Sequence, residues 1–301
     1  MGISIIIVDI SKKHSCINDC IWSIEKNCNI SNMEIIIVTD DKDNINYKNI
    51  KKMSSEGIDG ISKAWNLGVE ASKKENDIVI LDSSVIVSHD FIRNLRRCAY
   101  SDNKVAAVAP ATNISSYYQF IEGSNSLNDK DKMEEILKKN YESNECEWEE
   151  RQKIEGYCFF IKRQILNEIK CFDNIYKTLE YAESDFSVNL INNGYKLILC
   201  KDTYVYRQTT NKIYDYIYKQ LLDVEEKLFK NKWGFKASNK MNIDIGYLNF
   251  IKGNNPNIIE VGCGTGATAM YIMNRIDCNY YGINTYESSL SYYKGTKMNV
   301  I

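Results

Sequence analysis

The stretch Asp77-Ile-Val-Ile-Leu-Asp-Ser-Ser-Val-Ile-Val87 decides the fold, because it predicts a buried strand that ends on a carboxylate. Residues 78–81 are all apolar, as in a strand of a parallel sheet whose two faces are covered by helices. Asp82 then lies at the carboxyl end of the strand, where open α/β sheets bind their ligands. A carboxylate at that edge can face a metal ion, a ribose hydroxyl or a helix N-terminus, and a solvated surface residue is the alternative.

The residues before this stretch alternate between strands and helices. Residues 3–8 and 33–38 are apolar, β-branched runs that predict two more buried strands, and residues 15–26 between them have helical spacing. Asp40 and Asp41 follow the second strand directly, at the same edge of the sheet as Asp82. Solvated turn residues are the alternative interpretation of this pair.

Glycines lead into the next predicted helix, over about residues 61–71. A glycine turn before a helix presents backbone N–H groups that suit a phosphate, although no Gly-x-Gly-x-x-Gly or Walker pattern is present. A helix over about residues 90–98 and a strand over 105–109 follow the strand that ends at Asp82. This order is typical of a doubly wound α/β sheet.

Length and charge bound the classes of function. The 301 residues suffice for one large domain or for up to two ordinary ones. A net charge of −2 provides no long-range attraction for nucleic acid, so we expect no nucleic-acid partner. No apolar run is long enough to span a bilayer, and the first residues lack a signal-peptide pattern. We therefore expect a cytoplasmic protein without a transmembrane segment.

The ten cysteines include no Cys-x-x-Cys pair, and structural disulfides are not expected in an intracellular protein. His14, Cys16 and Cys20 could suggest a metal site. Because Cys20 shares a helical face with isoleucines at positions 17, 21 and 24, we interpret these cysteines as small core residues.

Several ordered segments resemble family 2 glycosyltransferases, which have the GT-A fold. Those resembling the nucleotide-binding half are Ser4-Ile-Ile-Ile-Val8, Glu34-Ile-Ile-Ile-Val-Thr-Asp-Asp41, Ala64-Trp-Asn-Leu-Gly68 and Ile80-Leu-Asp-Ser-Ser-Val-Ile-Val87. Those resembling the acceptor-binding half are Gly156-Tyr-Cys-Phe-Phe-Ile-Lys-Arg163, Cys171-Phe-Asp173, and Tyr181-Ala-Glu-Ser-Asp-Phe-Ser-Val-Asn-Leu190 with Gly194-Tyr195. Lys232-Trp-Gly234 resembles the rhamnosyltransferase-like members. The resemblance implies a GT-A domain over residues 1–211, Rossmann-like, with a mostly parallel sheet and helices on both faces.

The resemblance also implies a reaction. It is an inverting transfer of a hexosyl or deoxyhexosyl group from a nucleotide-diphosphate sugar to a hydroxyl of a bacterial-type glycan or glycoconjugate. Such a transfer needs positive charge on the diphosphate and a base near the acceptor hydroxyl. Aligning Asp185-Phe186 with the Asp-Leu of the family places Glu183 at the catalytic base, with Ala182 in the partner position. The alternative role for Glu183 is to stabilise the helix dipole.

Two departures from the family pattern concern the metal. The Asp-x-Asp motif appears as Asp82-Ser83-Ser84, and the downstream His falls at Arg207. Asp, neutral His and a divalent cation sum to +1, as do Ser and Arg. We therefore predict that Arg207 takes over part of the metal's work on the diphosphate. A divalent cation, Mg²⁺ or Mn²⁺, bound at Asp82 is the alternative.

The resemblance implies further contacts with the nucleotide. Asp40 or Asp41 resembles the carboxylate that contacts the base or ribose, and Lys63 and Asn66 lie where family members often touch the nucleotide. Lys63 could equally be a solvated helix residue. Asp185 is expected to cap or brace its helix.

Residues 212–256 predict an amphipathic helix and a linker. The apolar positions 213, 217, 221, 224 and 228 are three or four apart. Acidic residues at 223, 225 and 226 favour packing of this helix on protein. The alternative is a helix that lies on a membrane surface, which would make the protein peripheral to the membrane.

The stretch Asn257-Ile-Ile-Glu-Val-Gly-Cys-Gly-Thr-Gly-Ala-Thr-Ala269 resembles the first motif of class I S-adenosylmethionine (SAM) methyltransferases. Its key residues are Glu260, Gly262, Gly264 and Gly266, and Asn284 replaces the acid that normally binds the ribose. Two strands cannot close a sheet around a cofactor. We therefore expect residues 257–301 to be a truncated methyltransferase fragment, with SAM binding only in a complete domain.

Two other functions compete with the glycosyltransferase. A catalytically impaired relic that binds nucleotide sugars or glycans is favoured by Ser84 and Ala182. A nucleotidyltransferase ranks last, because the segment after Val8 lacks a glycine-rich phosphate loop.

Overall fold

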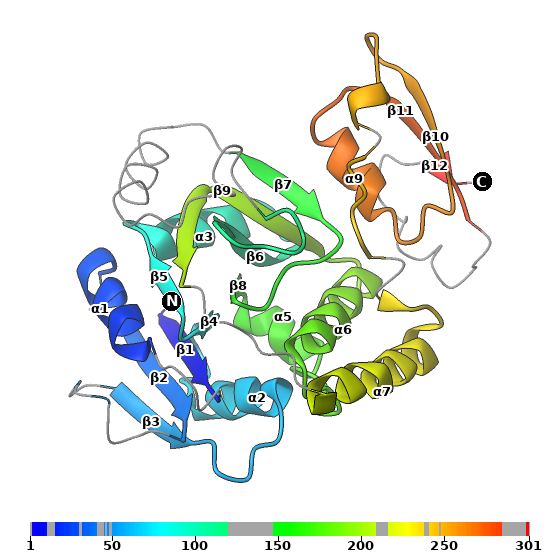
Figure 1. Cartoon of the computed structure of the whole chain (residues 1–301). Coiled ribbons are helices and arrows are strands. Elements are labelled where there is room, and N and C mark those ends of the chain that lie inside the picture. Colours follow the sequence, from blue (N-terminus) through cyan, green and yellow to red (C-terminus); the bar gives the residue numbers. More distant parts are fainter. Residues whose placement is uncertain are drawn as a thin grey trace.

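The computed structural model describes residues 2–10, 16–29, 32–40, 45, 47, 50–119, 147–208, 216–237, 241–246, 248–284 and 299–300. Within these ranges, the chain forms a nine-stranded mixed sheet and a three-stranded parallel sheet, each with helices against it (Figure 1). The predicted α/β architecture, with a large and mostly parallel sheet, is confirmed.

The first half of the large sheet is parallel. Its strands are β1 (Ile3–Asp9), β2 (Met33–Thr39), β3 (Ile50–Ser54) and β4 (Asp77–Asp82), in the spatial order β3-β2-β1-β4. Successive β1 side chains enter two different core clusters, because strand side chains alternate between faces. One cluster includes helix α2 (Ile61–Ala71), and the other includes α1 (Ile17–Asn27) and α3 (Phe91–Ala99). Helices therefore cover both faces.

Helix α2 approaches β1 closely at a glycine. A Cβ atom at Gly68 would lie 2.3 Å from the Ile6 Cγ2 atom, so a larger residue would force the helix away from the sheet.

The second half of the large sheet is mixed. Strand β8 (Cys158–Ile161) lies antiparallel between β4 and β6 (Val105–Thr112), and β9 (Lys196–Arg207) pairs parallel with β6. Two short strands, β5 (Val85–Val87) and β7 (Trp148–Arg151), add antiparallel to β9. Helices α5 (Arg163–Glu168) and α6 (Leu179–Asn192) follow β8.

Helix α7 (Tyr216–Trp233) packs on α6 through a different face from the predicted one. The predicted apolar stripe is largely exposed, with Ile217, Val224 and Leu228 at 74%, 51% and 38%. Glu225 and Phe229 are buried instead. The Glu225 carboxylate accepts hydrogen bonds from the backbone N–H groups of Lys177 and Thr178, at the start of α6. This cap turns the Glu225 side chain of α7 inward.

None of the described helices is both long and apolar enough to cross a membrane.

The C-terminal unit contains strands β10 (Asn257–Val261), β11 (Asn279–Ile283) and β12 (Asn299–Val300), which are parallel, and the helices η2 (Leu248–Phe250) and α9 (Ala267–Met273). It packs beside the large sheet with α9 against β7 (Figure 1). Arg275 anchors this contact, because its guanidinium pairs with both Glu149 carboxylate oxygens at 3.1 Å.

Candidate active site

Two acidic residues lie at the carboxyl edge of the large sheet. Asp82 ends β4 and is opposite Val8 on β1, and Asp9 is the last residue of β1. The Ser83 hydroxyl links the two strand ends by donating to Asp9 Oδ1 at 3.0 Å. The prediction that Asp82 lies at the edge of the sheet is confirmed. Asp9 was missed as a site residue, although it follows a buried apolar run in the same way as Asp82.

The Asp82–Ser84 turn is closed on itself. Asp82 Oδ1 accepts hydrogen bonds from the Ser84 backbone N–H at 2.9 Å and from the Ser84 hydroxyl. Ser84 therefore holds the carboxylate in the orientation that the turn requires.

Arg207 lies directly beside this turn. It ends β9 opposite Val85 of β5, and the next N–H, of Gln208, donates to the Ser84 carbonyl at 2.9 Å. Its guanidinium donates to the Ile114 carbonyl at 2.8 Å and lies 4.6 Å from the Tyr157 ring centroid. The cation is thus positioned at the strand ends by one hydrogen bond and one ring contact.

Glu183 is buried within α6. Its Oε2 atom accepts a hydrogen bond from the Gly156 N–H at 2.6 Å, and its Oε1 atom pairs with Lys153 Nζ at 2.9 Å. Burial raises the pKa of Glu183, and the Lys153 cation only partly offsets that rise. A carboxyl group with a raised pKa suits proton transfer near neutral pH.

The segment Gly156-Tyr157 connects the three predicted residues. The Asp82 N–H donates to the Tyr157 carbonyl at 2.8 Å, the Arg207 guanidinium lies over the Tyr157 ring, and Glu183 accepts a hydrogen bond from the Gly156 N–H. Side chains that are 125 positions apart in the sequence, from 82 to 207, therefore gather around two consecutive residues. Tyr157 is buried and was not predicted as a site residue.

The other predicted nucleotide contacts have partners within the protein. Asp40 accepts a hydrogen bond from the Ser55 hydroxyl, and Lys63 is a partly exposed residue paired with Asp59 at 2.6 Å. Asn66 donates to the Phe172 carbonyl at 2.7 Å and accepts from its N–H at 3.1 Å, so it braces the turn that resembles Gly-Phe-Asp.

Asp41 and Asp185 are the two remaining residues of the predicted site region. Asp41 lies outside the described residues. Asp185 accepts from Trp233 Nε1 at 2.7 Å and pairs with Lys232 at 2.8 Å, so it braces α6 against α7.

The residues at the sheet edge offer few metal ligands. Asp9 and Asp82 could supply the oxygen atoms that Mg²⁺ and Mn²⁺ prefer, but each already accepts a serine hydroxyl. Among the residues that the structure describes, no three His, Cys, Asp or Glu side chains group together as a metal site would require. The described side chains alone do not fit a divalent cation. His14 is not described, and Cys20 is a buried core residue of α1.

The glycines of the SAM-like motif form a tight loop between β10 and α9. Gly262, Gly264 and Gly266 have φ angles of 82°, 59° and 80°, a region that favours glycine. Glu260 accepts the Tyr280 hydroxyl at 2.9 Å, and Asn284 donates to the Gly264 carbonyl at 2.8 Å. A cavity of about 570 Å³ adjoins this loop.

No protein-family model and no curated protein sequence matches the chain. Similar solved structures include GalNAc-T7 with UDP, GalNAc and Mn²⁺, at 15% identity and a TM-score of 0.56, covering 76% of this chain and 49% of that one. A second is the mannosyltransferase PcManGT from Pyrobaculum calidifontis in complex with GDP-Man and Mn²⁺, at 14% identity and a TM-score of 0.50, covering 70% of this chain and 58% of that one. The chain spans about half the length of these proteins. At such low identity the similarity shows the fold, and it confirms the predicted GT-A architecture.

Proposed function

We propose that the chain is an inverting glycosyltransferase of family 2, which transfers a hexosyl or deoxyhexosyl group from a nucleotide-diphosphate sugar to a hydroxyl of a bacterial-type glycan or glycoconjugate. The observation that carries this proposal is the grouping of Asp82, Glu183 and Arg207 around Gly156-Tyr157. It lies at the edge of a GT-A sheet where such sheets bind ligands. The two similar structures contain UDP and GDP-Man, which is consistent with a nucleotide-sugar donor.

In this proposal Arg207 acts on the leaving group. As the bond between the anomeric carbon and the diphosphate oxygen breaks, the diphosphate takes the electron pair and gains negative charge. A guanidinium is always charged and can hold two phosphate oxygens at once. Its contact with the Tyr157 ring and its hydrogen bond to the Ile114 carbonyl hold those donors at the strand ends. Ser84, where the family has a carboxylate, adds no negative charge next to the diphosphate.

Glu183 acts as the base. The acceptor hydroxyl gives its proton to the carboxylate, and its oxygen attacks the anomeric carbon from the side opposite the diphosphate, which inverts the configuration. The Gly156 N–H can remain bound to Oε2 during this step, whereas Lys153 has to yield Oε1 to the hydroxyl. Asp40, Asp41 and Lys63 are proposed to contact the nucleotide, and Asn66 to support the site through the Phe172 turn.

The test is a transfer assay with a panel of UDP-, GDP- and dTDP-sugars, with nuclear magnetic resonance of the product to identify its anomeric configuration. Release of nucleoside diphosphate with an inverted product supports the proposal. A product of retained configuration would contradict the role of Glu183 as a base in single displacement.

A second candidate is a nucleotide-sugar-binding protein without turnover. It is favoured because both Glu183 oxygens already have partners and because Ala182 and Ser84 replace carboxylates of the family pattern. Saturable binding of a nucleotide sugar with no release of diphosphate across the panel would favour this candidate.

We further propose that residues 257–301 form a methyltransferase-like unit. The glycine loop between β10 and α9 supports the likeness.

A further inference from the structure

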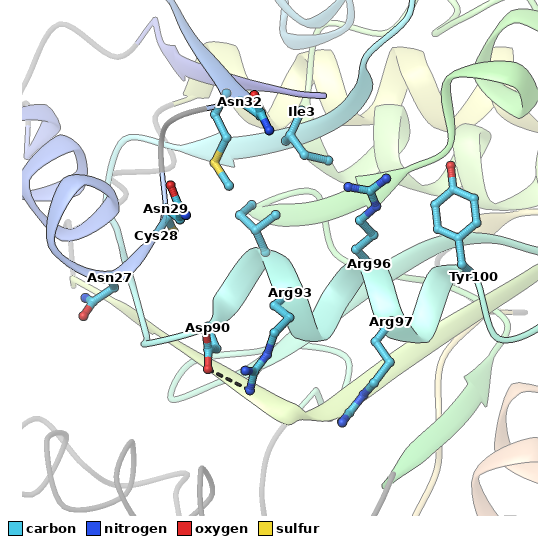
Figure 2. Close-up of a pocket in the computed structure, with 12 residues that line it drawn as sticks. Ile3, Asn27, Cys28, Asn29, Asn32, Asp90, Arg93, Arg96, Arg97 and Tyr100 are labelled. Atoms are coloured by element: carbon cyan, nitrogen blue, oxygen red, sulfur yellow. Dashed lines mark ion pairs between the residues drawn. The ribbon is translucent and has the colours of Figure 1, made fainter. Parts of the chain in front are cut away.

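A cavity of about 630 Å³ lies at the amino-terminal edge of the large sheet (Figure 2). Ile3 and Met33, the first residues of β1 and β2, line it together with the end of α1 and the helix α3. The seven residues of β1 place Asp9 roughly 20 Å away, at the opposite edge. The cavity is therefore separate from the proposed transfer site.

The lining of this cavity is rich in arginine. Arg93, Arg96 and Arg97 of α3 all contribute, and Asp90, the one acidic residue among the lining residues, pairs with Arg93 at 2.7 Å. Together these side chains carry a net charge of +2. Cys28 adds no negative charge at neutral pH, because burial raises its pKa to about 12.

Arg96 is the inner cation of the group. It is partly buried, whereas the Arg93 side chain is 65% exposed. Figure 2 shows Arg96 extending from α3 toward Ile3, at the start of β1. Its guanidinium lies 5.8 Å from the Tyr100 ring centroid, and the Tyr100 hydroxyl donates to Asp77 at 2.8 Å. The ring beside Arg96 is thus fixed, so Arg96 loses less conformational freedom when it binds a ligand.

Helix stability does not explain the whole group. Arg96 and Arg97 lie in the last turn of α3, where cations favour the helix dipole, and Arg97 pairs with Asp202 at 2.7 Å. Arg93 lies near the start of the helix, where a cation opposes the dipole. It is also four residues from Arg97, a spacing at which like charges repel.

We propose that this cavity binds the phosphate group of an organic phosphate, with Arg96 as the bidentate donor and Arg93 as a second cation. A phosphate monoester carries close to two negative charges at neutral pH, opposite in sign to the net charge of +1 that remains once Asp202 is counted against Arg97. The volume lies within the range of small-molecule sites, about 300–1,000 Å³. A soluble metabolite and an anionic lipid headgroup present the same group.

The test is isothermal titration calorimetry of the full chain with inorganic phosphate at low ionic strength. Arg96→Ala is expected to weaken binding about tenfold or more, the loss expected for one charge-assisted hydrogen bond. Lys227→Ala, which removes an exposed charge on α7, is the control and should bind like the parent. Equal affinity of the parent and Arg96→Ala overturns the proposal, as does no saturation of the parent at about 10 mM phosphate.

Two milder variants keep the test decisive if Arg96→Ala does not fold. Arg96→Lys keeps the positive charge but loses the two parallel N–H donors that allow bidentate binding, and Arg93→Ala changes an exposed side chain. Both should fold and weaken phosphate binding, and unchanged binding in both contradicts the proposal.

Sedimentation with vesicles separates the two sources of phosphate. Phosphatidylcholine vesicles with and without phosphatidic acid are compared. If the parent sediments with the vesicles that contain phosphatidic acid and Arg96→Ala does not, the cavity binds a lipid headgroup. Binding of free phosphate without retention on vesicles assigns it to a soluble phosphate.

Discussion

Gly156 donates its backbone N–H to Glu183 over 2.6 Å, so the proposed base is held by the same two-residue segment that contacts Asp82 and Arg207. The segment can approach α6 this closely only because residue 156 has no side chain. A Cβ atom there would lie 2.6 Å from Leu179 Cδ1 and 2.9 Å from Trp65 Cη2. One glycine thus couples the packing of α6 to the geometry of the proposed site.

Gly156→Ala is expected to lower the free energy of unfolding by about 1–3 kcal/mol, the usual cost of overpacking a core. Chemical denaturation monitored by circular dichroism measures the change. Gly246→Ala is the control, because a Cβ atom there meets only the end of the Asp244 side chain at 3.2 Å. Equal stability of the two variants would show that α6 can move away from residue 156 without cost.

Glu183→Gln is expected to reduce kcat by about 10²–10⁴-fold, because an amide cannot accept the proton of the acceptor. Binding of the nucleotide sugar should stay unchanged, which calorimetry can measure. Glu70→Gln, an exposed change on α2, is the control for loss of a carboxylate. A variant with parental kcat would remove Glu183 from the mechanism.

The pH dependence of transfer should report the raised pKa of Glu183. The base must be ionised, so kcat should rise with pH on the acid limb of the pH profile. The apparent pKa of that limb should lie above the ordinary glutamate pKa of about 4.3. Because the folded-state pKa is raised, the contribution of this group to stability is present at low pH and is lost as pH rises through that pKa. Lys153→Ala, which removes the opposing cation, should shift the limb to higher pH. An acid limb that does not move in Lys153→Ala would assign the titration to another group.

The sequence was sufficient to predict β1, β2 and β4, because each is a nearly continuous apolar run buried on both faces. It did not predict β3, β5 or β7. Strand β7 is Trp148-Glu-Glu-Arg151, whose polar residues form a strand only because β9 offers a free edge. Such pairing depends on distant partners that local patterns do not contain.

The same limit applies to the site and to α7. Asp82 could be predicted because a strand end is a local feature, whereas the role of Tyr157 depends on three segments that meet only after folding. The 3.6-residue period predicted an amphipathic α7, but not that Glu225 would be needed to cap α6. The need to satisfy the N–H groups at the start of α6 therefore decided which face of α7 is buried, and the apolar stripe did not.

The replacement of the metal by Arg207 can be tested by restoring the Asp and His residues of the family pattern at positions 84 and 207. The parent is expected to keep transferring sugar in EDTA, because Arg207 supplies the charge. Arg207→His should lower kcat by about 10²–10³-fold, the usual loss on removing a group that stabilises developing charge. In Ser84→Asp combined with Arg207→His, we expect Mn²⁺ to restore part of the activity, since the two residues are adjacent to the same turn. Complete loss of parental activity in EDTA, restored by Mn²⁺, would contradict the substitution of Arg207 for the metal.

The contact between the C-terminal unit and β7 depends on Glu149. Its carboxylate pairs with Arg151 at 2.7 Å, Lys201 at 2.9 Å and Arg275 at 3.1 Å. Burial alone would raise the pKa of Glu149, but these cations outweigh it and lower the pKa, so its contribution to stability is present at neutral pH and is lost as pH falls through the lowered value. Glu149→Gln should cost about 3–5 kcal/mol, because it leaves Arg151, only 1% exposed, without a counter-charge. Arg275→Ala should cost about 1 kcal/mol, since two cations remain. Denaturation of both variants at pH 7 measures the difference, and equal losses would mean that Arg275, rather than the buried Arg151 pair, dominates the contact.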